Sequence, residues 1–187
     1  MKIPGEMRNS LICIKSLEPN DFSRQIVKWF NDPVINQYLM ARFKKNYIFE
    51  QVKYINELNK SNSAYYFGIF LTSNSSLIGT CTCRLKNQNE LEIGLMIGEN
   101  NFWRKGIGTA TLSLIEDFAK KIGVSKLSAG IEVDNTASVS LFTKRGYLLV
   151  KKGKLNDFGV ECLVASKHLE NRNLKSNKNI HKRDSNG

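Results

Sequence analysis

The stretch Trp103-Arg104-Lys105-Gly106-Ile107-Gly108-Thr109-Ala110 decides the fold, because it connects a predicted strand to a predicted helix. Its two glycines lack a Cβ, so a ligand can come close to the backbone N–H groups. The start of the helix offers further free N–H groups and a partial positive charge, to which Arg104 and Lys105 add full charges. The segment therefore predicts an anion site suited to a pyrophosphate.

The spacing of this turn excludes two common phosphate loops. It is not a P-loop, because G-x-x-x-x-G-K-[ST] is absent, and it is not G-x-G-x-x-G, because the third glycine is missing. The alternative is that Gly106 and Gly108 only permit a tight turn, and spacing alone does not decide between the two interpretations.

Hydrophobic periodicity on both sides of the turn predicts an α+β fold. Residues 91–97 alternate, with Leu91, Ile93, Leu95 and Ile97 on one face and Glu92, Gly94 and Met96 on the other. Strands are expected at residues 11–14, 65–71, 77–85, 91–97, 126–133, 147–154 and 160–166. Helices are expected at residues 21–30, 49–58, 106–122 and 136–144, with a short helical segment around residues 34–38 that the order below does not count. The order β-α-α-β-β-β-α-β-α-β-β predicts a mixed, mostly antiparallel sheet flanked by helices, with one crossover helix after the fourth strand.

The length of the chain limits the number of domains, and its net charge limits the kinds of ligand to be expected. The 187 residues carry a net charge of +11, which favours an anionic ligand without identifying it. Residues 1–170 are expected to form a single domain, with residues 1–10 loosely held. The polar, basic segment 171–187 is expected to be a disordered tail.

Residue usage excludes several kinds of site. The two histidines, His168 and His181, lie near the C-terminus, so a Ser-His-Asp triad, a Cys-His pair and a multi-histidine metal site are not expected. The four cysteines form no C-x-x-C motif, so they are expected to be free thiols in the core, and no metal is expected. No signal peptide and no apolar run of about 18 residues is found, so a cytoplasmic protein without membrane insertion is expected.

The turn at residues 103–108 resembles the acetyl-CoA motif (Q/R)xxGx(G/A) of the GNAT N-acetyltransferase superfamily. Residues 91–97 resemble the fourth strand of that family in its "EIGY-I" version. Residues 134–138 resemble the N-x-x-S that opens the next helix, and residues 141–147 resemble the closing L-x-x-K-x-G-(F/Y). The resemblance is specific over residues 90–150 and looser over residues 11–85. Trp103 departs from the Q/R position, as in the branch that contains ribosomal-protein N-terminal acetyltransferases and many small-molecule relatives.

The resemblance implies acetyl-CoA as co-substrate and a set of residues that hold it. The amides of the turn would bind the CoA pyrophosphate, the end of the preceding strand would pair with the pantetheine, and the later helix would line its arm. These residues are Arg104, Lys105, Gly106, Ile107, Gly108 and Thr109 for the pyrophosphate, Leu95, Met96 and Ile97 for the pantetheine, and Asn135, Ser138 and Phe142 for the arm, with Lys144 reaching a phosphate.

The expected reaction is direct attack of an amine on the acetyl-CoA thioester. An alkylamine has a pKa of about 10, so its proton must be removed, and Glu92 is the candidate base. Relatives often use a glutamate here through water; the alternative is a glutamate that only pairs with a cation or binds substrate. A backbone N–H near Met96 or Ile97 would stabilise the oxyanion. Many relatives have a tyrosine where Phe142 stands, so either water serves as acid or the thiolate leaves unaided.

The stretch 29–42 is expected to select the acceptor. It resembles the W-x-N-D-P-x-V-x-x-Y-(L/M) segment of acetyltransferases that act on nucleotide-linked amino sugars in surface-glycan pathways, although ribosomal-protein acetyltransferases begin similarly. Tyr38 and Met40 would contact a sugar or base and Arg42 a phosphate, whereas Trp29 is expected to be a core anchor.

Three function classes follow from these observations. The first class is an amine N-acetyltransferase. Within it, a small-molecule acceptor is favoured over a protein N-terminus, which would need a groove open at both ends of the thioester. The second class is a CoA-binding module without catalysis. The third, nucleic-acid binding, is not expected, because the basic residues are dispersed and no recognition motif is present. Either a monomer or a homodimer is compatible with the sequence.

Overall fold

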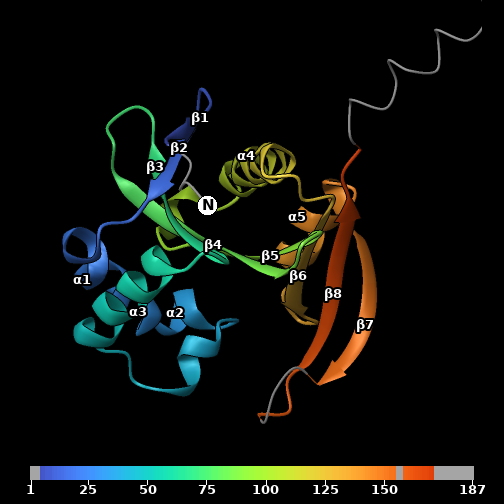
Figure 1. Cartoon of the computed structure of the whole chain (residues 1–187). Helices are drawn as coiled ribbons and strands as arrows, with labels where there is room; N and C mark the ends of the chain where they lie inside the picture. Colours follow the sequence, from blue (N-terminus) through green and yellow to red (C-terminus); the bar gives the residue numbers. More distant parts are fainter. Residues whose placement is uncertain (1–4, 155–157, 171–187) are drawn as a thin grey trace, which may run out of the picture.

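An eight-stranded mixed sheet organises the computed structural model, which describes residues 5–154 and 158–170 (Figure 1). The strand order is β1-β2-β3-β4-β5-β6-β8-β7, and every neighbouring pair is antiparallel except β5 and β6, which are parallel. Parallel neighbours need a crossover connection, which helix α4 supplies. The predicted α+β fold and its crossover helix are confirmed, whereas the predicted basic tail lies outside the described residues.

The elements follow the predicted order. The strands are β1 (Met7–Arg8), β2 (Ile12–Ser16), β3 (Ala64–Leu71), β4 (Leu77–Asn87), β5 (Glu90–Ile97), β6 (Lys126–Glu132), β7 (Leu148–Lys154) and β8 (Glu161–His168). The helices are α1 (Pro19–Phe30), α2 (Pro33–Asn36), α3 (Ile48–Lys60), α4 (Ile107–Lys121) and α5 (Thr136–Lys144), with 3₁₀ turns η1 (Met40–Phe43) and η2 (Asn100–Phe102). Within the described ranges, no helix combines the length and apolar character needed to cross a membrane.

The N-terminal segment differs from the prediction that residues 1–10 are loosely held. Met7 and Arg8 form β1 and pair with Ile14 and Cys13 of β2. The reason is a turn between β1 and β2 that a side chain stabilises. The Asn9 Oδ1 accepts hydrogen bonds from the backbone N–H groups of Leu11 and Ile12, each at 3.0 Å. Asparagine stabilises such a turn without apolar patterning, so periodicity could not reveal it.

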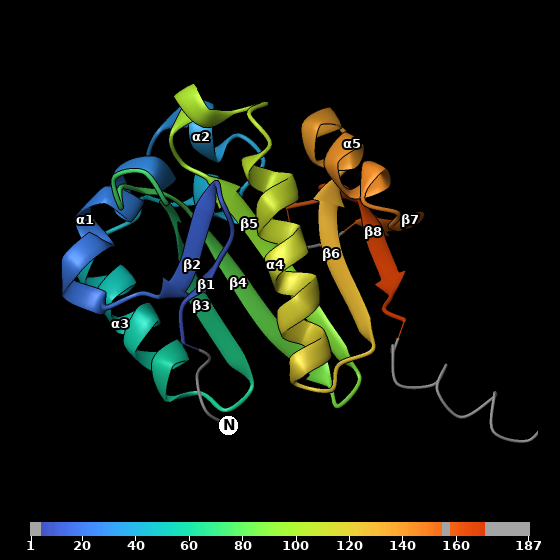
Figure 2. The same cartoon turned by 90° about the horizontal axis from the view of Figure 1, so that it is seen from above.

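The sheet separates two hydrophobic cores, one on each face. On the face we call the α4 face, odd-numbered residues of β5 and β6 pack against α4 and α5, with Phe118 among the fully buried side chains. On the opposite face, the α3 face, α1 and α3 pack on β3 and β4, with Trp29 and Met96 in the same core. Figure 2 shows α4 lying along the sheet in front of β4 and β5, with α5 toward β6, β8 and β7.

Candidate functional site

Strands β5 and β6 pair over only three residues and then separate. The pairs are Glu90–Lys126, Leu91–Leu127 and Glu92–Ser128. Beyond Glu92, β5 stays paired with β4 as far as Ile97, and β6 stays paired with β8 as far as Glu132. The sheet therefore has an opening between residues 93–97 and 129–132, which we call the β5–β6 opening.

The edge of β5 at this opening carries backbone groups that the sheet does not use. The Gly98 N–H donates to the Ile78 carbonyl on the β4 side (2.9 Å), whereas the Asn89 carbonyl accepts from Lys126 on the β6 side (2.9 Å). Because backbone groups point alternately to the two sides of a strand, those of Ile93, Leu95 and Ile97 turn toward the opening. An extended ligand can therefore pair with this edge as an additional strand, and of the two predicted oxyanion donors the alternation favours the Ile97 N–H.

The turn before α4 stands at the end of this edge. Trp103, which is 37% exposed, donates from its Nε1 to the Ile97 carbonyl at 2.9 Å and so ties the turn to β5. No side chain among the described residues caps the N-terminus of α4. The first N–H groups of a helix have no partner inside the helix, so those of residues 107–109 are available to an anion.

The two glycines of the turn are needed for different structural reasons. Gly106 caps α4 in the left-handed region, with φ of 80°, and the neighbouring Arg104 is also left-handed, with φ of 60°. Gly108 lies against α5, where an added Cβ would come within 2.8 Å of the Leu141 Cδ2. Gly106 therefore meets a conformational need of the turn, whereas Gly108 allows α4 and α5 to pack closely, and either role is compatible with an anion at the amides.

Glu92 lies on the α3 face where the β5–β6 opening begins. Its Oε1 is 3.2 Å from the Lys86 Nζ, and its side chain is 38% exposed. Directly opposite on β4 is Arg84, whose guanidinium donates to the Tyr54 hydroxyl of α3 at 2.6 Å. These residues line a cavity of about 500 Å³ between α3 and the ends of β3, β4 and β5. Glu92 is thus a solvent-accessible carboxylate beside a cavity.

Glu90, two residues earlier on the same face, is bound to β6. Its Oε2 accepts from the Lys126 Nζ at 2.9 Å and its Oε1 from the Ser128 hydroxyl at 2.7 Å. The lysine hydrogen bond, followed by that of the serine, lowers the pKa of the Glu90 carboxyl. Of the two carboxylates, Glu90 joins β5 to β6 where their pairing begins, and Glu92 is the more exposed one, at the pair where it ends.

The α5 residues predicted to contact the cofactor lie in three environments. The Asn135 Oδ1 accepts from the Ser138 N–H at 3.0 Å and caps α5. Phe142 is buried in the core of the α4 face, edge-on to Tyr147 with ring centroids 4.9 Å apart, and Lys144 is exposed. Burial raises the pKa of the Tyr147 phenol, with the Glu116 carboxylate adding to the effect. Tyr147 is therefore a packing residue of this core.

The stretch 29–42 builds a polar framework around α2. Trp29 is buried, as expected of a core anchor, and its Nε1 donates to the Glu99 Oε1 at 3.2 Å. Asp32 caps α2 by accepting from the Val34 N–H at 2.8 Å. The Asn31 side chain binds the backbone of the buried Asn46 twice: its Nδ2 donates to the Asn46 carbonyl at 2.9 Å, and its Oδ1 accepts from the Asn46 N–H at 3.0 Å. The W-x-N-D-P residues therefore fix the conformation of the segment that precedes η1.

Of the three predicted acceptor residues, Arg42 has the best-defined partner. Tyr38 is half-buried and Met40 is 44% exposed. Arg42 binds Glu132 at the end of β6 through two hydrogen bonds of 2.6 and 3.1 Å, and its guanidinium lies 4.2 Å from the centre of the Phe43 ring. Phe43 in turn stacks on Phe158. Glu132 is a functional candidate that sequence reasoning missed, although the alternation of β6 places it on the α3 face.

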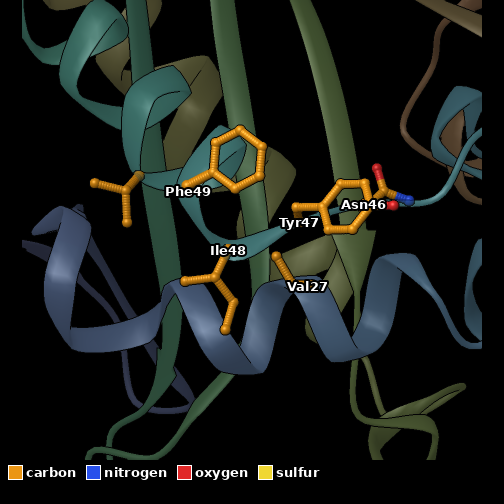
Figure 3. Close-up of a pocket in the computed structure, with 6 residues that line it drawn as sticks. Val27, Asn46, Tyr47, Ile48 and Phe49 are labelled. Carbon is orange, nitrogen blue, oxygen red and sulfur yellow. The ribbon is translucent and has the colours of Figure 1, made fainter.

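A larger cavity, of about 700 Å³, lies between α1 and the start of α3 (Figure 3). Its lining is mainly apolar and contains no carboxylate, amine or imidazole; it consists of Val27, Asn46, Tyr47, Ile48, Phe49 and Val52. None of the predicted site residues belongs to it, and its side chains offer no group for acid–base chemistry. Among the described residues, no group of three or more His, Cys, Asp or Glu could hold a metal ion.

Comparison of the sequence with known proteins identifies one domain family. The family model described as acetyltransferase (GNAT) domain matches residues 12–147. An uncharacterized protein of Methanocaldococcus jannaschii is 29% identical over 152 residues, which are 80% of this chain but only 31% of that protein. Acetyltransferase PseH of Campylobacter jejuni is 28% identical over 142 residues, which are 75% of this chain and 85% of that protein.

Solved structures share the fold at lower sequence identity. A spermidine N-acetyltransferase of Vibrio cholerae, in complex with CoA and spermine, has a TM-score of 0.71 at 19% identity, covering 86% of this chain and 97% of that chain. An acetyl transferase of Salmonella typhimurium that modifies the N-terminal serine of ribosomal protein L7/L12 has a TM-score of 0.73 at 14% identity, covering 87% and 97%. Acceptors as different as a polyamine and a protein terminus thus occur on this fold, so the fold does not identify the acceptor.

Proposed function

The chain belongs to the GNAT acetyltransferase family, and from this premise we propose that it transfers an acetyl group from acetyl-CoA to the amine of a small acceptor. The observation that carries the proposal is the placement of three features around one opening. Three features border it: the edge of β5 at Leu95 and Ile97, which does not pair with β6, the uncapped helix N-terminus at Gly106, and the accessible carboxylate of Glu92.

Acetyl-CoA would bind along the edge of β5. The backbone amides of residues 106–109 fit the pyrophosphate, with Arg104 and Lys105 supplying charge. The pantetheine would pair with Leu95 and Ile97, while Met96 faces the core of the α3 face. In α5, Ser138 and Asn135 would border the arm, the buried Phe142 would support it from the core, and the exposed Lys144 would reach a phosphate.

The acceptor would approach from the α3 face, where Glu92 lies. Glu92, through a water molecule, takes a proton from the ammonium so that the neutral nitrogen attacks the thioester carbonyl. A C–N bond forms, and the oxyanion accepts a hydrogen bond from the Ile97 N–H. The oxyanion then collapses to the amide carbonyl as the C–S bond breaks, and the attacking nitrogen releases its remaining extra proton to water. CoA leaves as a thiolate, which needs no protein acid because a thiol has a pKa of about 8.5. Phe142 has no proton to give.

For the acceptor we favour a nucleotide-linked amino sugar. Supporting this are the resemblance of residues 29–42 to acetyltransferases of that class, the match with acetyltransferase PseH, and the net charge of +11. The Arg42–Glu132 pair bridges from η1 to β6 on the α3 face. A long polypeptide acceptor would need a groove open at both ends, and this ion pair closes one end. The pair therefore argues against a protein N-terminus as acceptor.

Acetyl-CoA turnover, followed by release of the free CoA thiol, tests the proposal across an acceptor panel. The panel comprises UDP-linked 4-amino sugars, polyamines, aminoglycosides and ribosomal N-terminal peptides. A kcat/KM that is highest for the amino sugars is the expected result, whereas turnover with the peptides alone would establish the protein N-terminal alternative. CoA binding by calorimetry without turnover on any amine would instead point to a CoA-binding module.

A further inference from the structure

We propose that Gly94 of β5 and Gly130 of β6 form the floor of the acceptor subsite, a strip without side chains that admits a ring beside Glu92. The inference rests on the proposed acetyl transfer and adds the residues that set the width of the acceptor. It is argued from the strand register and exposure of both glycines and from the space around Gly94.

The two glycines occupy equivalent places on the two sides of the β5–β6 opening. Glu92 and Ser128 form the last pair between the strands, and each glycine lies two residues further along its own strand. Residues two apart share a face, so a side chain at either position would project from the α3 face, as those of Glu92 and Ser128 do. Both glycines are exposed, so no other part of the described chain covers this strip.

The fold itself does not require glycine at position 94. An added Cβ would meet only the Thr82 Cβ, at 3.8 Å, which is an ordinary contact. Neither glycine has a positive φ, so a side chain would cause no backbone strain. Gly98 at the end of the same strand differs, because its Cβ would collide with the Trp29 ring. A glycine within a strand weakens it and often marks a bulge, a bend or the close approach of a ligand. The β4–β5 register does not shift at Gly94, so the close approach of a ligand is the reason we favour.

The groups at the two ends of the strip define what fits on it. Glu92 stands at one end, where an ammonium would lose its proton. At the other end the Arg42–Glu132 bridge closes the strip, with side chains only 21% and 10% exposed. An acceptor that lies flat between them is short and broad, as a single hexose ring carrying an amine is. A linear amine uses only part of that width.

Side chains of increasing size at positions 94 and 130 test the inference. We expect Gly94→Val and Gly130→Val to raise KM for a UDP-linked 4-amino-4-deoxyhexose by roughly tenfold or more, with smaller effects from the Ala variants. KM for 1,4-diaminobutane, if it is turned over, should change less than about threefold, because a linear amine avoids the added methyls. The Kd of acetyl-CoA, measured by calorimetry, should stay unchanged.

Gly5→Ala is the matched control, since Gly5 is exposed with no atom within 4 Å of an added Cβ. Thermal unfolding of every variant shows whether the fold is intact. An unchanged amino-sugar KM in well-folded Val variants would overturn the inference, as would an equal loss for both amines with weakened acetyl-CoA binding. Failure of the wild-type protein to acetylate any amine would instead contradict the proposed function itself.

Discussion

At the residue scale, Glu92 is the carboxylate that the proposed chemistry needs. Its substitution tests whether it acts as a base or only forms a surface ion pair. We expect Glu92→Gln to lower kcat by about 10²- to 10³-fold, because the amide cannot accept the amine's proton. The Kd of acetyl-CoA should not change, since the carboxylate lies on the opposite face from α4. Steady-state kinetics and calorimetry measure the two quantities.

Glu57→Gln is the control for that variant, because Glu57 lines the same cavity from α3 and is ion-paired with Lys53 at 3.9 Å. Its kcat should match that of the wild type. Equal activity of Glu92→Gln and the wild type would show that Glu92 only pairs with Lys86, the alternative that the sequence left open.

The cysteines give a second prediction at this scale. All four are buried free thiols, and burial raises the pKa of Cys13 to about 11. The pKa of Cys83 is raised well above its ordinary value, first by its hydrogen bond with Cys81 and then by burial. Because thiolates are the reactive form, we expect no thiol of the native protein to react with Ellman's reagent at pH 8 within minutes.

In denaturant all four cysteines should react. The same reagent can therefore follow CoA release without a background from the protein. A thiol that reacts in the native state faster than the protein unfolds would contradict the buried placement of that cysteine.

At the element scale, α4 has a left-handed glycine at each end. The same substitution at both ends therefore distinguishes the effect of backbone strain from the effect of blocked ligand binding. Gly106 and Gly123 both have φ of 80°, and in neither case would a Cβ meet an atom closer than 4.0 Å. We expect Gly106→Val and Gly123→Val to lose similar stability, roughly 1–3 kcal/mol. Only Gly106→Val should weaken acetyl-CoA binding, by about tenfold or more, because its side chain shields the amides of the anion site.

Urea unfolding and calorimetry on both variants provide the comparison. Retained acetyl-CoA affinity in a folded Gly106→Val protein would show that the pyrophosphate does not bind at the N-terminus of α4. Equal losses of affinity in both variants would mean that strain in α4, and not blocked amides, weakens binding.

The pairing of β5 with β6 gives a pH-dependent prediction. The pKa of Glu90 is lowered in the folded protein, so its contribution is present above its ordinary pKa of 4.5 and is lost as the pH falls through the folded value. We expect Glu90→Gln to lower the free energy of unfolding by about 1 kcal/mol at pH 7, since the Glu90 side chain is only 19% exposed. The difference from the wild type should shrink as the pH falls below 4.5 in urea titrations. A difference that does not vary with pH would show that the ion pair with Lys126 does not stabilise the fold.

Elements with strong periodicity could be predicted from the sequence, and those fixed by polar side chains could not. The range of α5 agrees with the prediction at both ends, and α4 agrees within one residue, because glycines and an apolar stripe define them. The short β1 depends on the Asn9 turn, and η1 is held by the Asn46 side chain, which donates to the Ala41 carbonyl; neither element has a periodic pattern. In the site, the turn before α4 and the face of Glu92 could be predicted from residue order alone. The Arg42–Glu132 pair joins residues 90 positions apart, so only the fold reveals it.

At the scale of the whole molecule, the β5–β6 opening divides the sheet into two parts that are held together on both faces. On the α4 face, the buried Glu116 of α4 binds Arg145 after α5 at 2.6 Å and Lys167 of β8 at 3.0 Å. On the α3 face, the Arg42–Glu132 pair joins η1 to β6. These contacts span the opening without filling its strand edges, so the sheet can remain separated there in the absence of a ligand. That preorganisation reduces the cost of inserting an extended cofactor.

The net charge of +11 leads to a prediction about the molecule as a whole. CoA is a polyanion, and a basic surface raises its local concentration at distances within the Debye length, about 10 Å at 0.1 M salt. We therefore expect KM for acetyl-CoA to rise several-fold between about 20 mM and 300 mM NaCl, while kcat at saturation stays constant. A chain ending at residue 170 should keep most of this dependence, because Arg104, Lys105 and Lys144 remain beside the proposed site. If the dependence disappears on truncation, the basic segment 171–187 attracts the cofactor. If it is absent from the full chain as well, the excess of basic residues serves a different anionic partner, and the salt dependence of RNA binding becomes the next quantity to measure.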